Sequence, residues 1–192
     1  GSAVLPCNWL QTMENAVDMH HVDWLHGRFS DYVLERLGRG ELKRRNIVAG
    51  NVEDDWRLYK EVVYEPYENG ILKRTLRDGG TYDDPDWRIG FPILFPNIGR
   101  VGGDLQYRVP VDDTHTHYIY IKAHHQPPGE VVAKQEKVPY YQVPLPMDEN
   151  GVADWSLLDA NAGQDHFAWI TQGEIADRTE EKLGESDIGL IA

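Results

Sequence analysis

Apolar residues near the N-terminus recur at intervals of three to five positions, which predicts an amphipathic helix over residues 9–25. Gly27 follows the last apolar position, and a glycine there is typical of a helix end. A shorter helix is predicted over residues 32–37, within the polar stretch that follows. The apolar series of the first helix comprises Leu10, Met13, Val17, Val22 and Leu25.

From residue 47 onward the spacing of apolar residues changes to that of short strands. Asn69-Gly70 and Gly102-Gly103 each lie between two such strands, and both dipeptides indicate hairpin turns. The predicted strands cover residues 56–64, 71–76, 91–101, 105–111 and 116–123.

The last third of the chain returns to a helical pattern. Several prolines predict a surface loop over residues 126–150. A final helix is predicted over residues 164–172, with Asn161 as its N-cap. A helix, a run of antiparallel strands and a closing helix together predict an α+β fold.

Composition narrows the classes of function. With 192 residues, the chain suits one domain or two small ones. The formal net charge of −13 would repel phosphate backbones, so nucleic acid is not an expected partner. The basic clusters Lys43-Arg44-Arg45 and Lys73-Arg74 lie among acidic neighbours and are interpreted as solvated faces.

The lengths of the apolar runs and the number of cysteines further restrict the cellular environment and the cofactors expected for this chain. No apolar run approaches the ~20 residues that span a bilayer, so no membrane association is expected. Cys7 is the only cysteine, which excludes an internal disulfide and is consistent with a reducing cytoplasm. It also excludes a cysteine-ligated iron–sulfur cluster within this chain.

Histidines and carboxylates cluster over residues 14–26, and two imidazoles with one carboxylate are a typical ligand set for non-haem Fe(II). His21 and His26 are five positions apart and would diverge by ~140° on a regular helix. His20 and His26 would diverge by ~120° in the other direction. A shared metal therefore requires the helix to end, or to widen into a π-type turn, between the two ligands. The alternative from the residues alone is an amphipathic helix with partly exposed histidines.

The segment that begins Asn8-Trp9-Leu10-Gln11 resembles the ligand helix of Rieske oxygenase α subunits. The pattern of that family, Asn-x-x-Asp-x-x-His-x-x-x-x-His, is matched at Asn15, Asp18, His21 and His26. Two later segments are similar to the phthalate and phenoxybenzoate dioxygenase branch. They are Val109-Pro110-Val111-Asp112-Asp113 and Gly184-Glu185-Ser186-Asp187.

The resemblance implies roles for individual residues. His21 and His26 would be the iron-binding imidazoles. Asp165, in the context Gln164-Asp165, would be the carboxylate ligand. Without the resemblance, Asp165 would be interpreted as a first-turn aspartate that favours the helix dipole. Weaker alternatives for the carboxylate ligand are Asp148, Asp154 and Asp159.

The resemblance also assigns residues beside the iron. Asp18 would accept a hydrogen bond from an iron-bound histidine and carry electrons from the cluster domain of a neighbouring subunit. Asn15 and Trp24 would lie beside the ligands or wall the pocket.

The implied fold is a helix-grip (START/Bet v 1-like) domain, with a curved antiparallel sheet around a long C-terminal helix. Residues 3–192 would form the catalytic mononuclear-iron domain, and the N-terminal Rieske [2Fe–2S] domain would be absent from this chain. Gly1-Ser2 resembles a cloning scar.

The implied activity is mono- or dioxygenation, or O-demethylation, of an aromatic compound with O₂ and Fe(II). Electrons would come from NAD(P)H through a reductase or ferredoxin, and a [2Fe–2S] cluster is expected only in the missing domain. The intact protein would be a homotrimer.

Two other interpretations remain open. His115 and His117 lie two apart on a predicted strand and so share a face, which would suit a cupin-like metalloenzyme. A non-enzymatic helix-grip module that binds a hydrophobic ligand is the second alternative.

Overall fold

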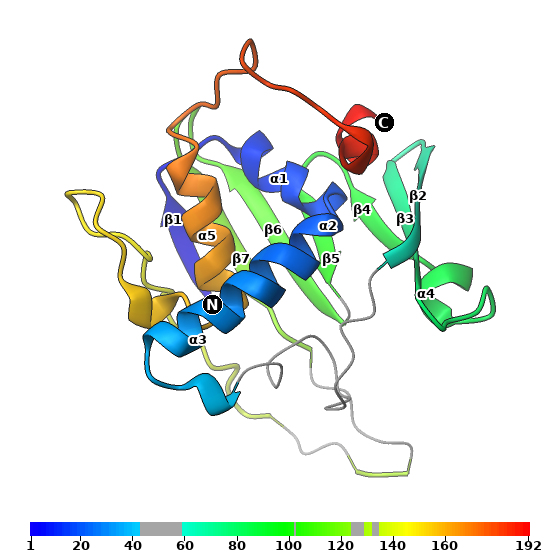
Figure 1. Cartoon of the computed structure of the whole chain (residues 1–192), viewed down its shortest axis with the longest axis horizontal. Coiled ribbons are helices and arrows are strands. Elements are labelled where there is room, and N and C mark those ends of the chain that lie inside the picture. The colour runs from blue at the N-terminus through cyan, green and yellow to red at the C-terminus, as the bar shows by residue number, and fades with distance from the viewer. Residues whose placement is uncertain (43–58, 102, 124–128, 132–134) are drawn as a thin grey trace.

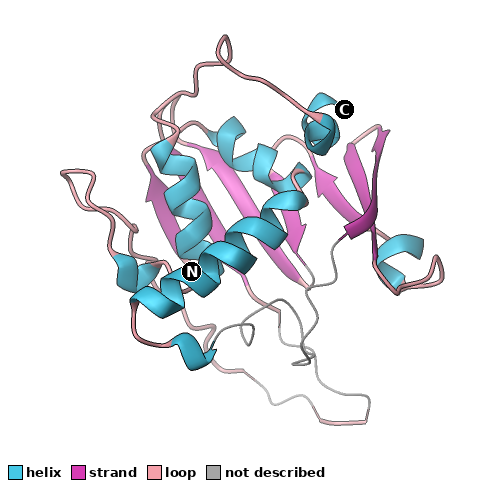
Figure 2. Ribbon diagram, in the orientation of Figure 1, coloured by secondary structure: helices cyan, strands magenta, loops and turns pink. Residues whose placement is uncertain are grey.

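The computed structural model describes residues 1–42, 59–101, 103–123, 129–131 and 135–192. Within these residues the chain forms an α+β fold in which one twisted antiparallel sheet carries helices on one face (Figures 1 and 2). None of the helices in this part of the chain has the length and hydrophobicity needed to cross a lipid bilayer.

The sheet has seven strands in the order β1-β7-β6-β5-β4-β3-β2, and every pair of neighbours is antiparallel. From β2 to β7 each strand pairs with the next along the chain, while β1 joins the edge beside β7 (Figure 1). The strands are β1 (Ser2–Leu5), β2 (Tyr59–Tyr67), β3 (Gly70–Arg77), β4 (Phe91–Leu94), β5 (Ile98–Val101), β6 (Asp104–Pro110) and β7 (Thr116–Ile121).

The helices that form the second layer come from both ends of the chain (Figure 1). From the N-terminal part come α1 (Trp9–Val17), α2 (His20–Asp23), the π-helix η1 (Trp24–Phe29) and α3 (Ser30–Arg36). The later helices of this layer are α5 (Asn161–Thr171) and α6 (Ile188–Ile191). The short helix α4 (Pro85–Arg88) comes from the middle of the chain and lies beside β3 (Figure 1). Short 3₁₀ turns are η2 (Gly40–Leu42), η3 (Trp155–Leu157) and η4 (Glu185–Asp187).

Two apolar clusters hold the helices on the sheet. In the first, Trp169 of α5 packs against Tyr118 of β7 and against β1. In the second, Met13 and Val17 of α1 pack against Ile71 of β3 and Ile93 of β4. Burial of side chains of this size typically contributes ~1.5–3 kcal/mol each, so both contacts fix the helix layer firmly. The space between the two clusters contains the functional site described below.

The predicted hairpins are confirmed. β2 and β3 flank the turn before Gly70, whose positive φ of 151° suits a glycine. The single strand predicted over 91–101 is wrong, because it divides into β4 and β5. Pro96 lies in the break and has no backbone N–H to donate to a ladder. Residues 56–58, Gly102 and the basic cluster at 43–45 lie outside the described part of the chain.

Three sequence expectations need correction. The strand β1 was not predicted, because four residues show too little alternation to be recognised. The N-cap of α5 is Ala160 and not Asn161, which is the first helical residue. The expectation of a long C-terminal helix is not confirmed, since α5 has 11 residues and α6 has 4. The observed sheet and helix layer are compatible with a helix-grip-like fold.

Candidate metal centre

The predicted continuous helix over residues 9–25 is interrupted at Asp18. Asn8 caps the start of α1, because its side-chain oxygen accepts a hydrogen bond from the backbone N–H of Leu10. Asp18 has an extended backbone and ends this helix. Its carboxylate then accepts the backbone N–H groups of His20 and His21, at 2.9 and 3.2 Å. Asp18 therefore redirects the chain and fixes the start of the next helix.

A π-helix resolves the angular problem of the two histidines. Over Trp24–Phe29 the helix takes the wider π form, in which hydrogen bonds join residues five apart. His21 and His26, which are five apart, consequently lie on the same side, with ring centroids 5.0 Å apart. The prediction that Gly27 ends the helix is wrong, because the chain continues through Gly27 into α3.

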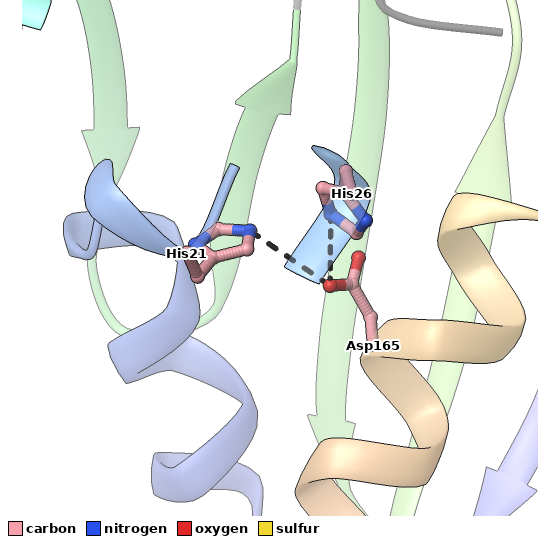
Figure 3. Close-up of side chains that lie close together, drawn as sticks. All are labelled: His21, His26 and Asp165. Carbon is pink, nitrogen blue, oxygen red and sulfur yellow. Dashed lines mark ion pairs between the residues drawn. The ribbon is translucent and has the colours of Figure 1, made fainter. Parts of the chain in front are cut away.

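Asp165 reaches the two imidazoles from α5, the neighbouring helix of the same layer (Figure 3). Its Oδ1 atom lies 3.1 Å from Nε2 of His26 and 3.8 Å from Nε2 of His21. Asp165 and His26 are buried, and His21 is partly buried. One ligand atom from each of the three residues lies within 4.8 Å of the others.

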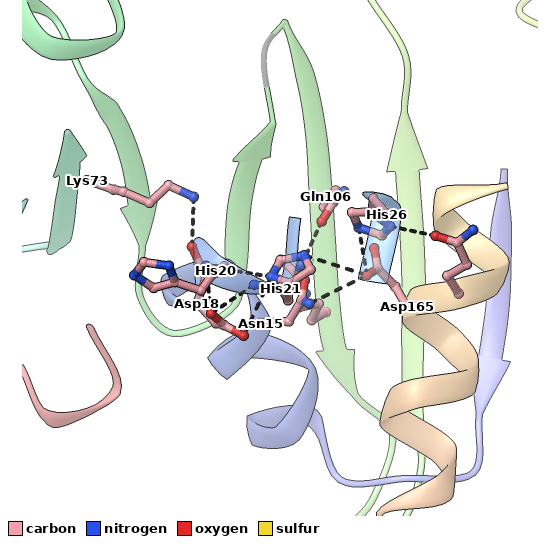
Figure 4. A network of polar contacts seen from close by, with 11 residues as sticks. Asn15, Asp18, His20, His21, His26, Lys73, Gln106 and Asp165 are labelled. Atoms are coloured by element: carbon pink, nitrogen blue, oxygen red, sulfur yellow. Dashed lines mark hydrogen bonds and ion pairs between the residues drawn. The ribbon is translucent and has the colours of Figure 1, made fainter. Parts of the chain in front are cut away.

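Hydrogen bonds at Nδ1 orient both imidazole rings (Figure 4). Nδ1 of His26 lies 2.9 Å from Oε1 of Gln164, whose Nε2 donates to the carbonyl of Leu158. Nδ1 of His21 lies 2.5 Å from the carbonyl oxygen of Asp18. Carbonyl and amide oxygens only accept hydrogen bonds, so each Nδ1 carries a proton and donates it. Each Nε2 is turned toward Asp165. It would offer its lone pair to a bound metal, whereas without metal a protonated Nε2 of His26 donates to the carboxylate.

Electrostatics within the triad favour an ionised carboxylate. Burial alone would raise the pKa of Asp165, but the hydrogen bond from His26 and the charges of both histidines outweigh it and lower that pKa. For His26, burial lowers the pKa, and the hydrogen bond and charge of Asp165 reverse the direction and raise it. For His21, burial prevails and the pKa is lowered. Each of these pKa shifts is relative to the pKa of the same side chain when isolated in water.

The donor set suits a divalent transition metal of the iron type. Two imidazole nitrogens and one carboxylate oxygen form the facial ligand set typical of non-haem Fe(II). Ligand atoms that share one such ion at ~2.0–2.2 Å lie roughly 3–4 Å apart, and the distances from Asp165 to the two histidines agree with this. The residues therefore fit a mononuclear metal with small movements of the side chains.

Asn15 lies beside the triad. Its Nδ2 atom is 3.5 Å from Oδ1 of Asp165, and its side chain lines the adjoining cavity. Trp24 does not wall that cavity. Its side chain is 62% exposed, with the guanidinium of Arg28 above its ring, because this position of the π-helix faces solvent.

The alternative ligands lie elsewhere. His115 is paired with exposed Asp112, with Nδ1 3.0 Å from the carboxylate, and His117 pairs with β1 at the edge of the sheet. The structure does not bring these histidines to the triad. Asp148 and Asp154 accept backbone N–H groups in their own turns, and Asp159 pairs with Arg39.

A cavity of about 220 Å³ opens beside the triad, between the covered face of the sheet and the helices. Asp165, His21 and His26 form part of its wall. The other polar groups include Lys73, which the sequence analysis interpreted as part of a solvated face. That interpretation is wrong, because side chains alternate along β3 and Lys73 points inward, where it is 7% exposed.

Sequence reasoning missed several polar groups of this cavity, among them Gln106 and Arg108 of β6. Both are buried, and they alternate with more exposed neighbours along the strand. The sequence did contain a signal, because residues 106 and 108 are two apart on a predicted strand and must therefore share one face of the sheet.

No family model matches the chain. Three curated proteins are similar to it over almost its whole length. The 5,5'-dehydrodivanillate O-demethylase oxygenase subunit of Sphingobium sp. (strain NBRC 103272 / SYK-6) is 30% identical over 188 residues, which cover 98% of this chain and 40% of that protein. The phthalate 4,5-dioxygenase oxygenase subunit of Pseudomonas putida is 25% identical over 217 residues, which cover 98% of this chain and 47% of that protein.

The third relative is the phenoxybenzoate dioxygenase subunit alpha of Ectopseudomonas oleovorans, which is 26% identical over 202 residues. The match covers 97% of this chain and 40% of that protein. The chain thus spans less than half the length of the curated relatives it matches.

Proposed function

The chain belongs to the family of Rieske-type oxygenase subunits, and on this premise we propose that it holds their mononuclear iron. His21, His26 and Asp165 would bind one Fe(II) through Nε2, Nε2 and a carboxylate oxygen. The observation that carries the proposal is the convergence of these three atoms from α2, η1 and α5. A ferrous ion bound there supplies one-electron redox chemistry toward O₂ at its open positions.

The proposed reaction is oxygenation or O-demethylation of an aromatic compound. The names of the relatives describe dioxygenases and an O-demethylase, and their sequences match nearly all of this chain. In this chain, the cavity beside the triad would hold the aromatic ring next to the metal. Met19, Val22 and Phe91 supply apolar surface to it.

The proposed electron source is a Rieske [2Fe–2S] domain, supplied by a reductase or ferredoxin. This chain has one cysteine, Cys7, which is buried and cannot provide the pair of cysteines that such a cluster uses. We propose that residues 3–192 are the catalytic domain, and that electrons enter beside Asp18 from an adjacent subunit of a trimer. Asp18 supports this route, because its carbonyl oxygen is hydrogen-bonded to Nδ1 of His21 and its carboxylate is partly exposed.

The direct test is anaerobic titration of the metal-free chain with Fe(II). About one iron per chain is expected, and His21→Ala and His26→Ala should abolish binding because two protein ligands anchor a ferrous ion poorly. His115→Ala is the matched control, since His115 is exposed and distant from the triad, and it should bind iron like the parent chain. Full binding by both ligand variants, with loss in the control, would favour the cupin-like alternative.

Absence of iron binding by the parent chain would contradict the proposed site. Binding of aromatic compounds without metal would then favour the helix-grip module that carries a hydrophobic ligand.

A further inference from the structure

The corner between α1 and α2 leaves the last carbonyl groups of α1 without partners inside the helix. The last four carbonyls of an α-helix lack such partners, and in α1 they belong to residues 14–17. The backbone N–H of Asp18 serves two of them, at 3.1 Å from the carbonyl oxygen of Glu14 and 3.3 Å from that of Asn15. The carbonyls of Ala16 and Val17 therefore depend on other parts of the fold.

Lys73 of β3 supplies the partner of the Ala16 carbonyl. Its Nζ atom donates to that oxygen at 2.9 Å, and Figure 4 shows the side chain reaching from the sheet to the end of α1. Gly189 of α6 approaches the carbonyl of Val17, since a Cβ atom there would lie 2.3 Å from its oxygen. Lys73 thus connects this end of α1 to the sheet by a directional bond.

Apolar packing holds the same end of α1 close to the sheet. Ala16 belongs to the cluster that contains Ile71 and Ile93, and a Cβ atom at Gly99 of β5 would lie 3.7 Å from its Cβ. Such contacts fix how near the helix lies, but they are non-directional and do not fix where a carbonyl points. The hydrogen bond from Lys73 does, because its strength depends on the direction of approach.

A lysine is energetically costly at position 73. Its side chain is 7% exposed, and burial, followed by the charge of Arg108, lowers its pKa to about 8, while the charge of Asp18 acts in the opposite direction. At neutral pH the side chain is therefore still largely charged. A methionine would fill a similar space without the burial of a charge, so packing alone does not account for the lysine. A bond to a helix end does, because a cation is favoured beside the negative end of the helix dipole.

Two contacts lead from this corner to the first histidine of the triad. The carboxylate of Asp18 accepts the backbone N–H of His21 at 3.2 Å, which sets the start of α2. The backbone carbonyl of Asp18 lies 2.5 Å from Nδ1 of the same histidine and holds its ring. Asp18 follows Ala16 by two residues. The carbonyl that Lys73 fixes and the carbonyl that orients His21 therefore belong to one short turn of the chain.

We propose that Lys73 is a positioning residue of the triad, because its bond to the end of α1 fixes the corner that orients the ring of His21. Without the ammonium, α1 stays packed on the sheet, but the carbonyl of Asp18 is free to turn and the ring of His21 loses its fixed tautomer. The consequence for metal binding rests on the proposed function, whereas the orientation of His21 in the metal-free chain does not.

NMR of the metal-free chain with ¹⁵N-labelled histidine tests the orientation of the ring at neutral pH. In the parent chain His21 should be a single Nδ1–H tautomer, because the carbonyl oxygen beside Nδ1 only accepts a hydrogen bond. In Lys73→Met the two ring nitrogens of His21 should shift toward the values of a mixture of tautomers. Loss of the signals in His21→Ala assigns them.

Anaerobic titration with Fe(II) tests the consequence for the metal. Lys73→Met should bind iron about 10- to 100-fold more weakly than the parent chain, the range usual when a group that orients a metal-binding histidine is lost. Lys73→Gln carries its donor on a chain one bond shorter and should show smaller changes in the same direction, and it replaces Lys73→Met if that variant does not fold. Lys60→Met is the matched control and should behave like the parent chain, because Lys60 is exposed on β2.

Ile71→Val separates positioning from a merely structural role. Ile71 lies on the same strand and packs against α1, so the smaller side chain weakens that contact and should lower the free energy of unfolding in urea. It leaves the bond between Lys73 and Ala16 in place. Ile71→Val should therefore change neither the tautomer of His21 nor the affinity for Fe(II).

Three results would overturn the proposal: an unchanged His21 spectrum in the folded Lys73 variant, an unchanged affinity for iron in a variant whose ring has shifted, or equal shifts in Ile71→Val. The last would mean that any loosening of α1 disturbs the ring. If the parent chain bound no iron while the ring of His21 still responded to Lys73→Met, the metal site alone would be overturned.

Discussion

Gln164 holds the ring of His26 through a hydrogen bond between residues 138 positions apart in the sequence. The amide nitrogen of Gln164 donates to the carbonyl of Leu158, which leaves its oxygen to accept the Nδ1 proton of His26. The next residue, Asp165, presents its carboxylate to Nε2 of the same ring. One dipeptide of α5 thus fixes both the orientation of His26 and the position of the third ligand.

Replacing Gln164 should therefore weaken metal binding without removing a ligand. Gln164→Leu is expected to lower Fe(II) affinity about 10- to 100-fold, as is usual when the partner of a metal-binding histidine is lost. Gln164→Glu keeps an acceptor oxygen and should retain most of the affinity. Anaerobic Fe(II) titration measures both, and wild-type affinity in Gln164→Leu would show that the ring is held by other contacts.

Asp165 and Asp18 should respond differently to substitution. Asp165→Ala is expected to lose iron, because it removes one of three ligands. Asp18→Asn should keep most of the iron, since its backbone carbonyl still accepts the proton of His21. Iron content after gel filtration gives the comparison. If Asp18→Asn lost iron as completely as Asp165→Ala, the carboxylate of Asp18 would have to be a ligand.

Lys73 should make stability depend on pH in the alkaline range. Its pKa is about 8 in the folded chain and 10.5 when unperturbed, so the unfolded chain holds more protons between these values. Below pH 8 both states are protonated, and the unfavourable burial of the charge is fully present. As pH rises from 8 to 10.5 this cost is relieved, by about 3 kcal/mol in total.

The difference in the free energy of unfolding between the parent chain and Lys73→Met isolates the effect of Lys73 from that of other titrating groups. At pH 7 the variant should be the more stable of the two, and its advantage should shrink by about 3 kcal/mol toward pH 10.5. Urea unfolding at several pH values measures the free energies. A difference that stays constant with pH would mean that Lys73 titrates at its ordinary pKa.

Gly163 should be required for the placement of α5. A Cβ atom there would lie 1.8 Å from the carbonyl oxygen of Leu157, a clash with backbone that no rotamer relieves. Gly163→Ala should therefore destabilise the fold by about 1–3 kcal/mol, although alanine is the better helix former. Ala168→Gly in the same helix is the control for intrinsic propensity and should cost about 1 kcal/mol. Thermal unfolding measures both, and stabilisation by Gly163→Ala would contradict the contact.

Turnover should require a cluster domain in addition to this chain. The iron-loaded chain, given an aromatic substrate, NADH and a reductase, is expected to yield no multiple-turnover product, because it has no cysteine pair to hold a cluster. Fusion to about a hundred residues with a two-Cys, two-His cluster motif should restore turnover. Product measured by chromatography checks this, and turnover by the chain alone would show that another electron source suffices.

The sequence by itself determined the local elements and the types of ligand. The period of two predicted the hairpins around Gly70 and the strand that became β7, because side-chain alternation is a local property of a strand. The spacing of His21 and His26 restricted a shared metal to two helix geometries, since the angle per residue of a regular helix is fixed. The residues could not decide between those geometries, nor single out Asp165 from other late aspartates without the family resemblance.

Tertiary structure decided what depends on contacts between distant segments. The wider turn of η1 brings His21 and His26 to one side, and packing of Trp169 on Tyr118 places α5 so that Asp165 meets them. Neither event leaves a periodic signal in the sequence. The inward direction of Lys73 was also decided here, because a strand with charged residues on both faces does not reveal which face the helices will cover.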